Sequence, residues 1–135
     1  MMEPQGRVAV VAAVIQRGDK YLLGRRPKAK RHGGLWEFPG GKVHNGESHL
    51  EAIHRELAEE LALKAVRLGQ LLFSVADKGS PYFIEFVETF IDGTPIPYEH
   101  SEIAWLTIDE LDELRLAPAD AAFAAWLCQR AEPRP

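Results

Sequence analysis

Cysteine is almost absent from this sequence, with one example, Cys128, in 135 residues. A lone cysteine cannot form an internal disulfide, which excludes a disulfide-stabilised fold and makes a reducing, cytoplasmic location the simpler expectation. Cys128 lies in the apolar segment AAFAAWLCQR. No cysteine-centred motif surrounds it, so we expect a small buried side chain there rather than a catalytic thiol.

Long apolar runs and an excess of positive charge are also lacking. No apolar stretch approaches the roughly 18–20 residues that cross a bilayer, and MMEPQGR lacks the pattern of a signal peptide, so we expect no membrane partner. The net charge of −4 argues against long nucleic acid, which usually needs a basic face. A small anionic ligand remains compatible with this charge, because a bound divalent cation inverts the local sign.

The remaining composition is that of an ordinary globular chain, with 46% hydrophobic and 27% charged residues. There is no internal repeat, low-complexity tract or linker, so residues 1–135 are expected to form a single domain. Both a monomer and a homodimer are compatible with the sequence.

The apolar pattern predicts strands that alternate with two substantial helices. The expected strands cover 7–17, 20–26, 68–75, 82–91 and 99–106, with a short extended piece at 35–38. A tight turn at Gly18-Asp19 would join the first two strands as a hairpin. Thr107 would cap a helical turn over 108–114, Pro118 would begin a helix ending near Arg130, and the last five residues would fray. This order predicts an α+β fold, an α/β/α sandwich with a mixed sheet.

A helical period over 47–61 carries the chemistry. Leu50, Ile53, Leu57 and Leu61 would form one apolar face. Glu56, Glu59 and Glu60 stand at i, i+3 and i+4, which places three carboxylates together on another face. Such clustered hard oxygen ligands suit Mg²⁺ or Mn²⁺.

An isolated acidic cluster of this kind is more often a solvated helix face, but its surroundings favour a metal site. Arg55 can pair with Glu47 or with another acid and so orient the ligands. Gly40 and Gly41 let the backbone approach a phosphate closely.

These residues resemble the Nudix box. The family pattern is Gly, five residues, Glu, seven residues, Arg-Glu, a hydrophobic, any residue, Glu-Glu, any residue, Gly and a hydrophobic. The matching residues are Gly41, Glu47, Arg55, Glu56, Leu57, Glu59, Glu60 and Leu63. Ala62 departs from the family glycine. It would stand just past a helix end, where a left-handed backbone is common; either alanine there costs about 1 kcal/mol, or the helix ends slightly differently.

The run GGLWEFPGGKV and the order of elements are similar to the MutT-type branch of this family. The resemblance implies a Nudix α/β/α sandwich in which the box forms a loop–helix–loop. It also implies that Glu56, Glu59 and Glu60 bind divalent cations, with the main chain at Gly41 as a further ligand. Glu99 is expected as an added ligand or general base, with Glu102 as its competitor, and the choice of base between Glu56 and Glu99 stays open.

The resemblance extends to the substrate. Arg26 matches an arginine that contacts phosphate in MutT-like enzymes. Asp120, in RLAPADAAF, matches a residue that reads the base edge, although an acid at a helix start also favours the helix dipole. Phe38, Tyr82, Phe83 and Phe86 are candidates for base stacking, and each is also a candidate core residue. The five histidines show no zinc-like spacing and are interpreted as surface or supporting residues.

The resulting hypothesis is a Mg²⁺-dependent hydrolase that converts a nucleoside triphosphate to the monophosphate and pyrophosphate. The leading substrate is 8-oxo-dGTP or a related oxidised nucleotide. CTP, a modified dCTP or another nucleoside diphosphate-linked compound is the alternative. A nucleotide-sensing Nudix domain without catalysis is a third interpretation, which the intact glutamates disfavour.

Overall fold

The computed structural model describes residues 2–3 and 7–131, so the frayed tail expected at the C-terminus lies, after Ala131, outside the described residues. The elements are β1 (Met2–Glu3), β2 (Arg7–Val14), β3 (Gln16–Arg17), β4 (Lys20–Arg25), β5 (Trp36–Glu37), β6 (Gly40–Lys42), α1 (His49–Leu61), β7 (Lys64–Ala76), β8 (Tyr82–Asp92), β9 (Glu102–Thr107), α2 (Ile108–Asp112) and α3 (Pro118–Ala131). None of these described helices is long and apolar enough to cross a membrane.

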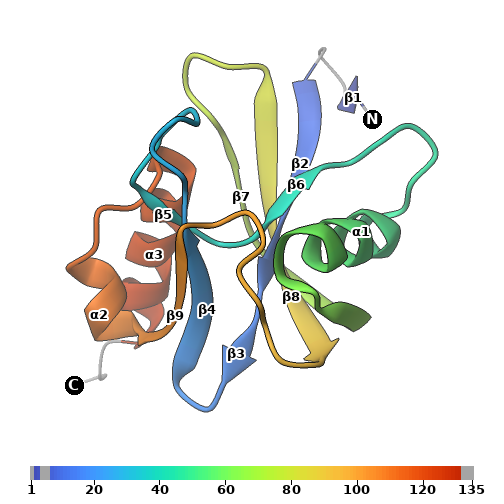
Figure 1. The fold of residues 1–135 in the computed structure, drawn as a ribbon. Helices are drawn as coiled ribbons and strands as arrows, with labels where there is room; N and C mark the ends of the chain where they lie inside the picture. Colours follow the sequence, from blue (N-terminus) through green and yellow to red (C-terminus); the bar gives the residue numbers. More distant parts are fainter. Residues whose placement is uncertain (1, 4–6, 132–135) are drawn as a thin grey trace.

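The described strands form two sheets between the helices (Figure 1). The main sheet has the order β1-β2-β8-β7, and β6 also pairs with β2. It is mixed, because β2 and β8 run parallel while the other pairs are antiparallel. In the second sheet, β4 pairs with β3, β5 and β9, all antiparallel.

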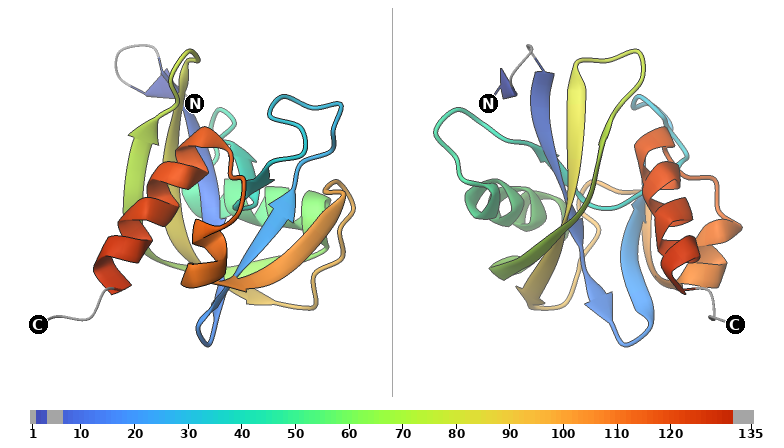
Figure 2. Two further views of the ribbon diagram at one scale, coloured as in Figure 1. Left: turned by 90° about the vertical axis from the view of Figure 1, so that its left-hand side faces the viewer. Right: turned by 180° about the vertical axis from the view of Figure 1, so that it is seen from behind.

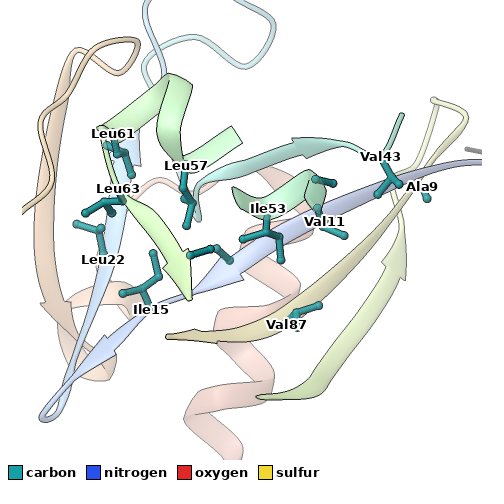
Figure 3. Packing of buried hydrophobic residues seen from close by; sticks show 13 residues of the cluster. Ala9, Val11, Ile15, Leu22, Val43, Ile53, Leu57, Leu61, Leu63 and Val87 are labelled. Carbon is teal, nitrogen blue, oxygen red and sulfur yellow. The ribbon is translucent and has the colours of Figure 1, made fainter. Parts of the chain in front are cut away.

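Alternating side chains of β2 pack into two hydrophobic cores, one on each face of the main sheet. Val11 and Ala13 face α1, where they pack with Ile53 and Leu57 (Figure 3). Ala12 and Val14 belong to the opposite core under α3. Helix α1 therefore covers one side of the sheets, and α2 and α3 cover the other (Figure 2). The predicted α+β fold with an α/β/α arrangement is confirmed.

The predicted hairpin with its turn at Gly18 is confirmed, but it is shorter than the two expected strands. The first strand ends at Val14, and pairing across the turn, where Gly18 has a φ of 62°, covers Gln16 and Arg17 of β3 and the Ile15 carbonyl, which accepts from the Leu22 N–H. Beyond the turn, β4 belongs to the second sheet. Residues 7–14 pair within the main sheet and residues 16–17 pair within the second sheet, so the strand is interrupted between them, at Ile15.

Three smaller expectations need correction. Leu50 is 38% exposed and does not join the buried face of α1, because it stands in the first turn of the helix. Strand β9 begins at Glu102, so Glu99 lies in the loop before it. Cys128 is half-buried rather than enclosed.

Candidate active site

Helix α1 sets the acidic residues by the way it begins. Ser48 caps it, accepting a hydrogen bond from the Glu51 backbone N–H, while the Glu51 side chain accepts one from the Ser48 N–H. This capping box fixes the start of the helix and therefore its register. Gly46, with φ of 81°, makes the preceding turn.

The three helix glutamates do not share one environment. Glu60 is 5% exposed, whereas the side chain of Glu59 is 54% exposed and lies beside Arg55. Glu56 is in between and lies against β6. A Cβ added at Gly41 would stand within 2.6 Å of both carboxylate oxygens of Glu56, so a larger residue there would displace this carboxylate.

Glu60 is a strongly perturbed acid. Burial raises its pKa to about 10, and the side-chain hydrogen bond with Glu56 and the charges of Glu37, Glu56 and Glu99 act in the same direction. Several carboxylates thus surround one buried carboxylate. Such a group gains most from a cation that neutralises it.

Arg55 supports the cluster from the side. Its Nε donates to Glu47 Oε2 at 2.8 Å and its Nη2 donates to Glu47 Oε1 at 3.0 Å. Nη1 reaches Glu56 Oε1 at 2.6 Å. Glu47 has its pKa lowered to about 2, chiefly by the hydrogen bonds from Arg55. The predicted pairing of Arg55 with Glu47 is confirmed.

Glu99 reaches the cluster from the loop between β8 and β9. That loop is bonded to the end of α1, since the backbone N–H of Tyr98 donates to the Glu60 carbonyl at 2.9 Å. Glu99 lines a cavity of about 410 Å³ together with Glu56 and Glu60. Glu102, the competing acid, instead pairs with Arg25 at 3.1 Å.

The donor set of this cavity fits a hard divalent cation. Its acids are carboxylates, which are the side chains that Mg²⁺ and Mn²⁺ prefer, and the buried Glu60 is destabilised in its ionised form without a cation. Among residues 2–3 and 7–131, no three acid, histidine or cysteine side chains are already in a formed metal geometry. Glu56, Glu60 and Glu99 would hold the ion, and Glu59 would need to turn inward from solvent.

A second cavity, of about 370 Å³, adjoins the first. The residues that line both are Arg26, Glu37, Gly40 and Lys42. Its floor includes Val10, Ala12 and Ile84 of the main sheet, and Phe38 and Tyr82 also line it. A mostly apolar cavity beside an acidic one suits a ligand with a flat apolar part and an anionic part.

Asp120 is the buried polar group of this second cavity. It is 8% exposed, and its Oδ1 accepts a hydrogen bond from the Phe38 backbone N–H at 2.9 Å. Burial, followed by the charge of Glu37, raises the pKa of Asp120 well above its ordinary value. The sequence predicts either a helix-start acid or a base-reading residue at Asp120, and in the structure it stands both in the first turn of α3 and in the cavity wall.

Arg26 and the aromatic residues can now be located. Arg26 lies at the junction of the cavities, where its Nη1 donates to Glu37 Oε1 at 2.9 Å. Tyr82 lines the second cavity with Lys42 Nζ 5.1 Å from its ring centre. Phe38 lines it too, with its ring edge-on to Phe86 in the core. Phe83 and Phe86 do not line it.

Comparison with known proteins agrees with this geometry. The family model described as the NUDIX domain matches residues 6–127. The CTP pyrophosphohydrolase of Escherichia coli is 39% identical over 116 residues, covering 84% of this chain and 85% of its own. The 8-oxo-dGTP diphosphatase of Haemophilus influenzae is 34% identical over 119 residues, covering 84% and 86%.

The chain belongs to the Nudix hydrolase family. Among solved structures, the Escherichia coli ORF135 protein superposes with a TM-score of 0.78 at 37% identity, covering 93% of this chain and 91% of that one. The predicted resemblance to Nudix enzymes is therefore confirmed, and the chain is a hydrolase of this family.

The Nudix box forms the expected loop–helix–loop, and Ala62 shows how it tolerates the missing glycine. Ala62 caps the C-terminus of α1 with φ of 57° and ψ of 30°, the left-handed conformation that glycine adopts freely. Its backbone N–H still bonds the carbonyl of Ala58 at 3.2 Å. The box thus keeps its geometry and carries a local strain at this residue.

The sequence did not single out Glu37, and it indicated only a surface or supporting role for His100. Glu37 lines both cavities and His100 lines the acidic one, with His100 Nε2 3.0 Å from Glu37 Oε2. Glu37 stands in the run GGLWEFPGG, which gave a signal for it. His100 had none, because its burial depends on contacts between β4, β5 and the loop before β9.

Proposed function

We propose that this Nudix hydrolase cleaves nucleoside triphosphates to the monophosphate and pyrophosphate with Mg²⁺, and that it acts on oxidised nucleotides such as 8-oxo-dGTP. The observation that supports this is the pair of adjoining cavities, one lined by Glu56, Glu60 and Glu99 and the other by Asp120 and Tyr82. A triphosphate and its base need two such neighbouring environments. A cytoplasmic location, where nucleotides are held, goes with this proposal.

The residues divide the work along the substrate. A divalent cation, when bound by the carboxylates, supplies charge neutralisation and an activated water. Arg26 would donate to a phosphate oxygen in place of its hydrogen bond to Glu37. Gly40 and Gly41 would let the backbone approach the phosphate closely. Glu56 or Glu99 would take the proton of the water.

The bond changes follow from attack on the β-phosphorus. The water oxygen forms a new bond to that phosphorus, and the bond to the α–β bridging oxygen breaks. The bridging oxygen leaves with the nucleoside monophosphate, and pyrophosphate carries the water oxygen. The protein mainly positions charge in this scheme.

Asp120 supports the choice of base. Burial raises the pKa of Asp120 well above its ordinary value, which favours the neutral carboxyl. A neutral carboxyl offers one donor and one acceptor, whereas an ionised carboxylate only accepts. The N7–H and O6 of 8-oxoguanine match this pattern. Unmodified guanine presents two acceptors, N7 and O6, along the same edge and does not.

Cytidine nucleotides are the second candidate. Cytosine presents an acceptor at N3 beside its amino donor, which a neutral carboxyl also matches. The similar Escherichia coli protein named CTP pyrophosphohydrolase favours this alternative.

The test is kcat/KM for 8-oxo-dGTP, dGTP, dCTP and CTP with Mg²⁺, with the products identified. A preference of 100-fold or more for 8-oxo-dGTP over dGTP, about 2.7 kcal/mol, would support removal of oxidised nucleotides. A preference for cytidine nucleotides would keep the hydrolase and reject that role. Absence of turnover with all of them, beside nucleotide binding, would favour the sensing domain.

A further inference from the structure

His100 is the most enclosed polar side chain near the acidic cavity that the proposed chemistry leaves without a task. It is 6% exposed and lines the cavity that holds Glu56, Glu60 and Glu99. Its Nε2 lies 3.0 Å from Glu37 Oε2 and 3.8 Å from Glu60 Oε1. Its Nδ1 is buried and has no hydrogen-bond partner among residues 2–3 and 7–131.

The fold provides a specific seat for the imidazole ring. Gly24 of β4 stands opposite Glu37 of β5 in the second sheet. A Cβ added at Gly24 would lie 2.5 Å from ring carbons of His100, so the ring occupies the space that a side chain would fill. Because Gly24 has no side chain, the imidazole ring of His100 can lie within hydrogen-bond distance of Glu37.

The loop around His100 is tied down on both sides. Before it, the Tyr98 N–H donates to the Glu60 carbonyl at 2.9 Å. After it, the Ser101 N–H donates to the Arg25 carbonyl at 3.0 Å. Glu99 lies between these two bonds, so its place depends on where residue 100 is held.

We propose that His100 is a positioning residue that holds the loop of Glu99 and the carboxylate of Glu60 in place by donating from Nε2 to Glu37. A carboxylate accepts and cannot donate, so Nε2 carries the hydrogen of this bond. Glu37 in turn bonds Arg26 through its other oxygen, at 2.9 Å. Histidine, Glu37 and Arg26 therefore link the metal-binding cavity to the phosphate-facing arginine.

This role of His100 rests on the proposed function only in taking the acidic cavity as the metal site. Metal binding is therefore measured directly, apart from nucleotide hydrolysis. Mn²⁺ is titrated into nucleotide-free protein and free Mn²⁺ is followed by electron paramagnetic resonance. The variants are His100→Leu, which removes the donor, and His100→Gln, whose amide nitrogen can replace Nε2. His49→Leu and His49→Gln are matched controls, because His49 Nε2 pairs with Glu85 at 2.8 Å outside both cavities.

His100→Leu should weaken Mn²⁺ binding on the order of 10–100-fold, as changes in groups that orient metal ligands do. It should lower kcat to a similar extent while KM for the nucleotide at saturating metal stays close to wild type. His100→Gln should recover most of both losses, and the His49 variants should change neither. Wild-type Mn²⁺ affinity in His100→Leu, or equal losses in His100→Gln and His100→Leu, would overturn the proposal.

Gly24→Ala gives a second route if His100→Leu does not fold. It keeps the imidazole but displaces the ring, so Mn²⁺ binding should again weaken, and unchanged binding would overturn the proposal. Failure of the proposed function looks different. In that case the wild type would hydrolyse no nucleotide, while its Mn²⁺ binding would still depend on His100.

Discussion

Arg55 forms a bidentate pair with Glu47, in which Nε donates to Oε2 at 2.8 Å and Nη2 donates to Oε1 at 3.0 Å. The same side chain bonds the carbonyl of Lys42 at 2.9 Å and the carboxylate of Glu56 at 2.6 Å. One arginine therefore joins the loop before α1, strand β6 and an expected metal ligand. Its role is to orient the ligand, since it stands beside the cavity rather than in its lining.

Arg55→Gln should lower kcat on the order of 10–100-fold with the fold retained, because Glu56 loses the group that orients it. Glu47→Gln should have a smaller effect in the same direction. Arg25→Gln is the matched control, since the Arg25 side chain pairs with the exposed Glu102 and bonds the Gly34 carbonyl, neither of which lines the acidic cavity. Steady-state kinetics and circular dichroism test this, and a loss in Arg25→Gln equal to that in Arg55→Gln would contradict it.

The Arg55–Glu47 pair also has a predictable pH dependence. The folded pKa of Glu47, about 2, lies below its ordinary value of 4.5, so its contribution to stability is complete above pH 4.5 and is lost as the pH falls towards 2. The gap in unfolding free energy between the wild type and Glu47→Gln should therefore narrow between these pH values. Urea unfolding at pH 7 and at pH 2.5 measures it, and a constant gap would be the contrary result.

Glu60 should behave in the opposite sense. Its folded pKa of about 10 lies above 4.5, so the metal-free protein holds a proton that the unfolded chain releases between those values. Stability should then fall as the pH rises from 4.5 towards 10. Glu60→Gln should raise the melting temperature of the metal-free protein at pH 8, at roughly 3–6 °C per kcal/mol.

Mg²⁺ provides the control for that result. It should raise the melting temperature of the wild type by binding the folded state, and it should do so far less in Glu60→Gln. If Glu60→Gln melts below the wild type in the absence of metal, the buried acid is not destabilising and the argument fails.

Asp120→Asn should preserve base selection, because an amide also offers a donor beside an acceptor and can keep the bond from Phe38. Asp120→Ala should lose about 1–3 kcal/mol of substrate discrimination, roughly 5- to 150-fold in kcat/KM for the preferred base. The exposed Asp112→Asn is the control. Equal losses in the asparagine and alanine variants would show that Asp120 acts as a carboxylate.

Ala62→Gly should stabilise the protein by about 0.5–1 kcal/mol without changing kcat, because glycine relieves the left-handed backbone at φ 57°. Ala58→Gly, at an exposed position inside the same helix, should instead destabilise it by about 1 kcal/mol. Denaturant unfolding compares the two. A loss of stability in Ala62→Gly would mean that the backbone there is not strained.

Local patterns carried most of what the sequence could predict. The helical spacing of Ile53, Leu57 and Leu61, the cap at Thr107 and the left-handed end at Ala62 all depend on neighbours within a few residues. Arg55 stands eight residues after Glu47, and this short separation also allowed their pairing to be predicted. These features are confirmed because local geometry alone decides them.

Contacts between segments that are distant in the sequence could not be predicted from local patterns. The break at Ile15 arises because the chain passes from one sheet to the other there, and the continuous apolar run within 7–17 does not encode it. His100 contacts Glu37 only because Gly24 leaves room for the imidazole ring. His100 and Glu37 are 63 positions apart in the sequence. The raised pKa of Asp120 likewise depends on its burial in the folded protein.

Pyrophosphate release from 8-oxo-dGTP and CTP, by the wild type and by Glu60→Gln, with Mg²⁺ and with chelator, tests the central claim most directly. Glu102→Gln, an exposed acid on the neighbouring strand, serves as the control. The account predicts Mg²⁺-dependent release of monophosphate and pyrophosphate by the wild type and Glu102→Gln, and loss of turnover in Glu60→Gln. Full activity in Glu60→Gln, or equal activity in chelator, would contradict the assignment of this cavity as the metal-dependent active site.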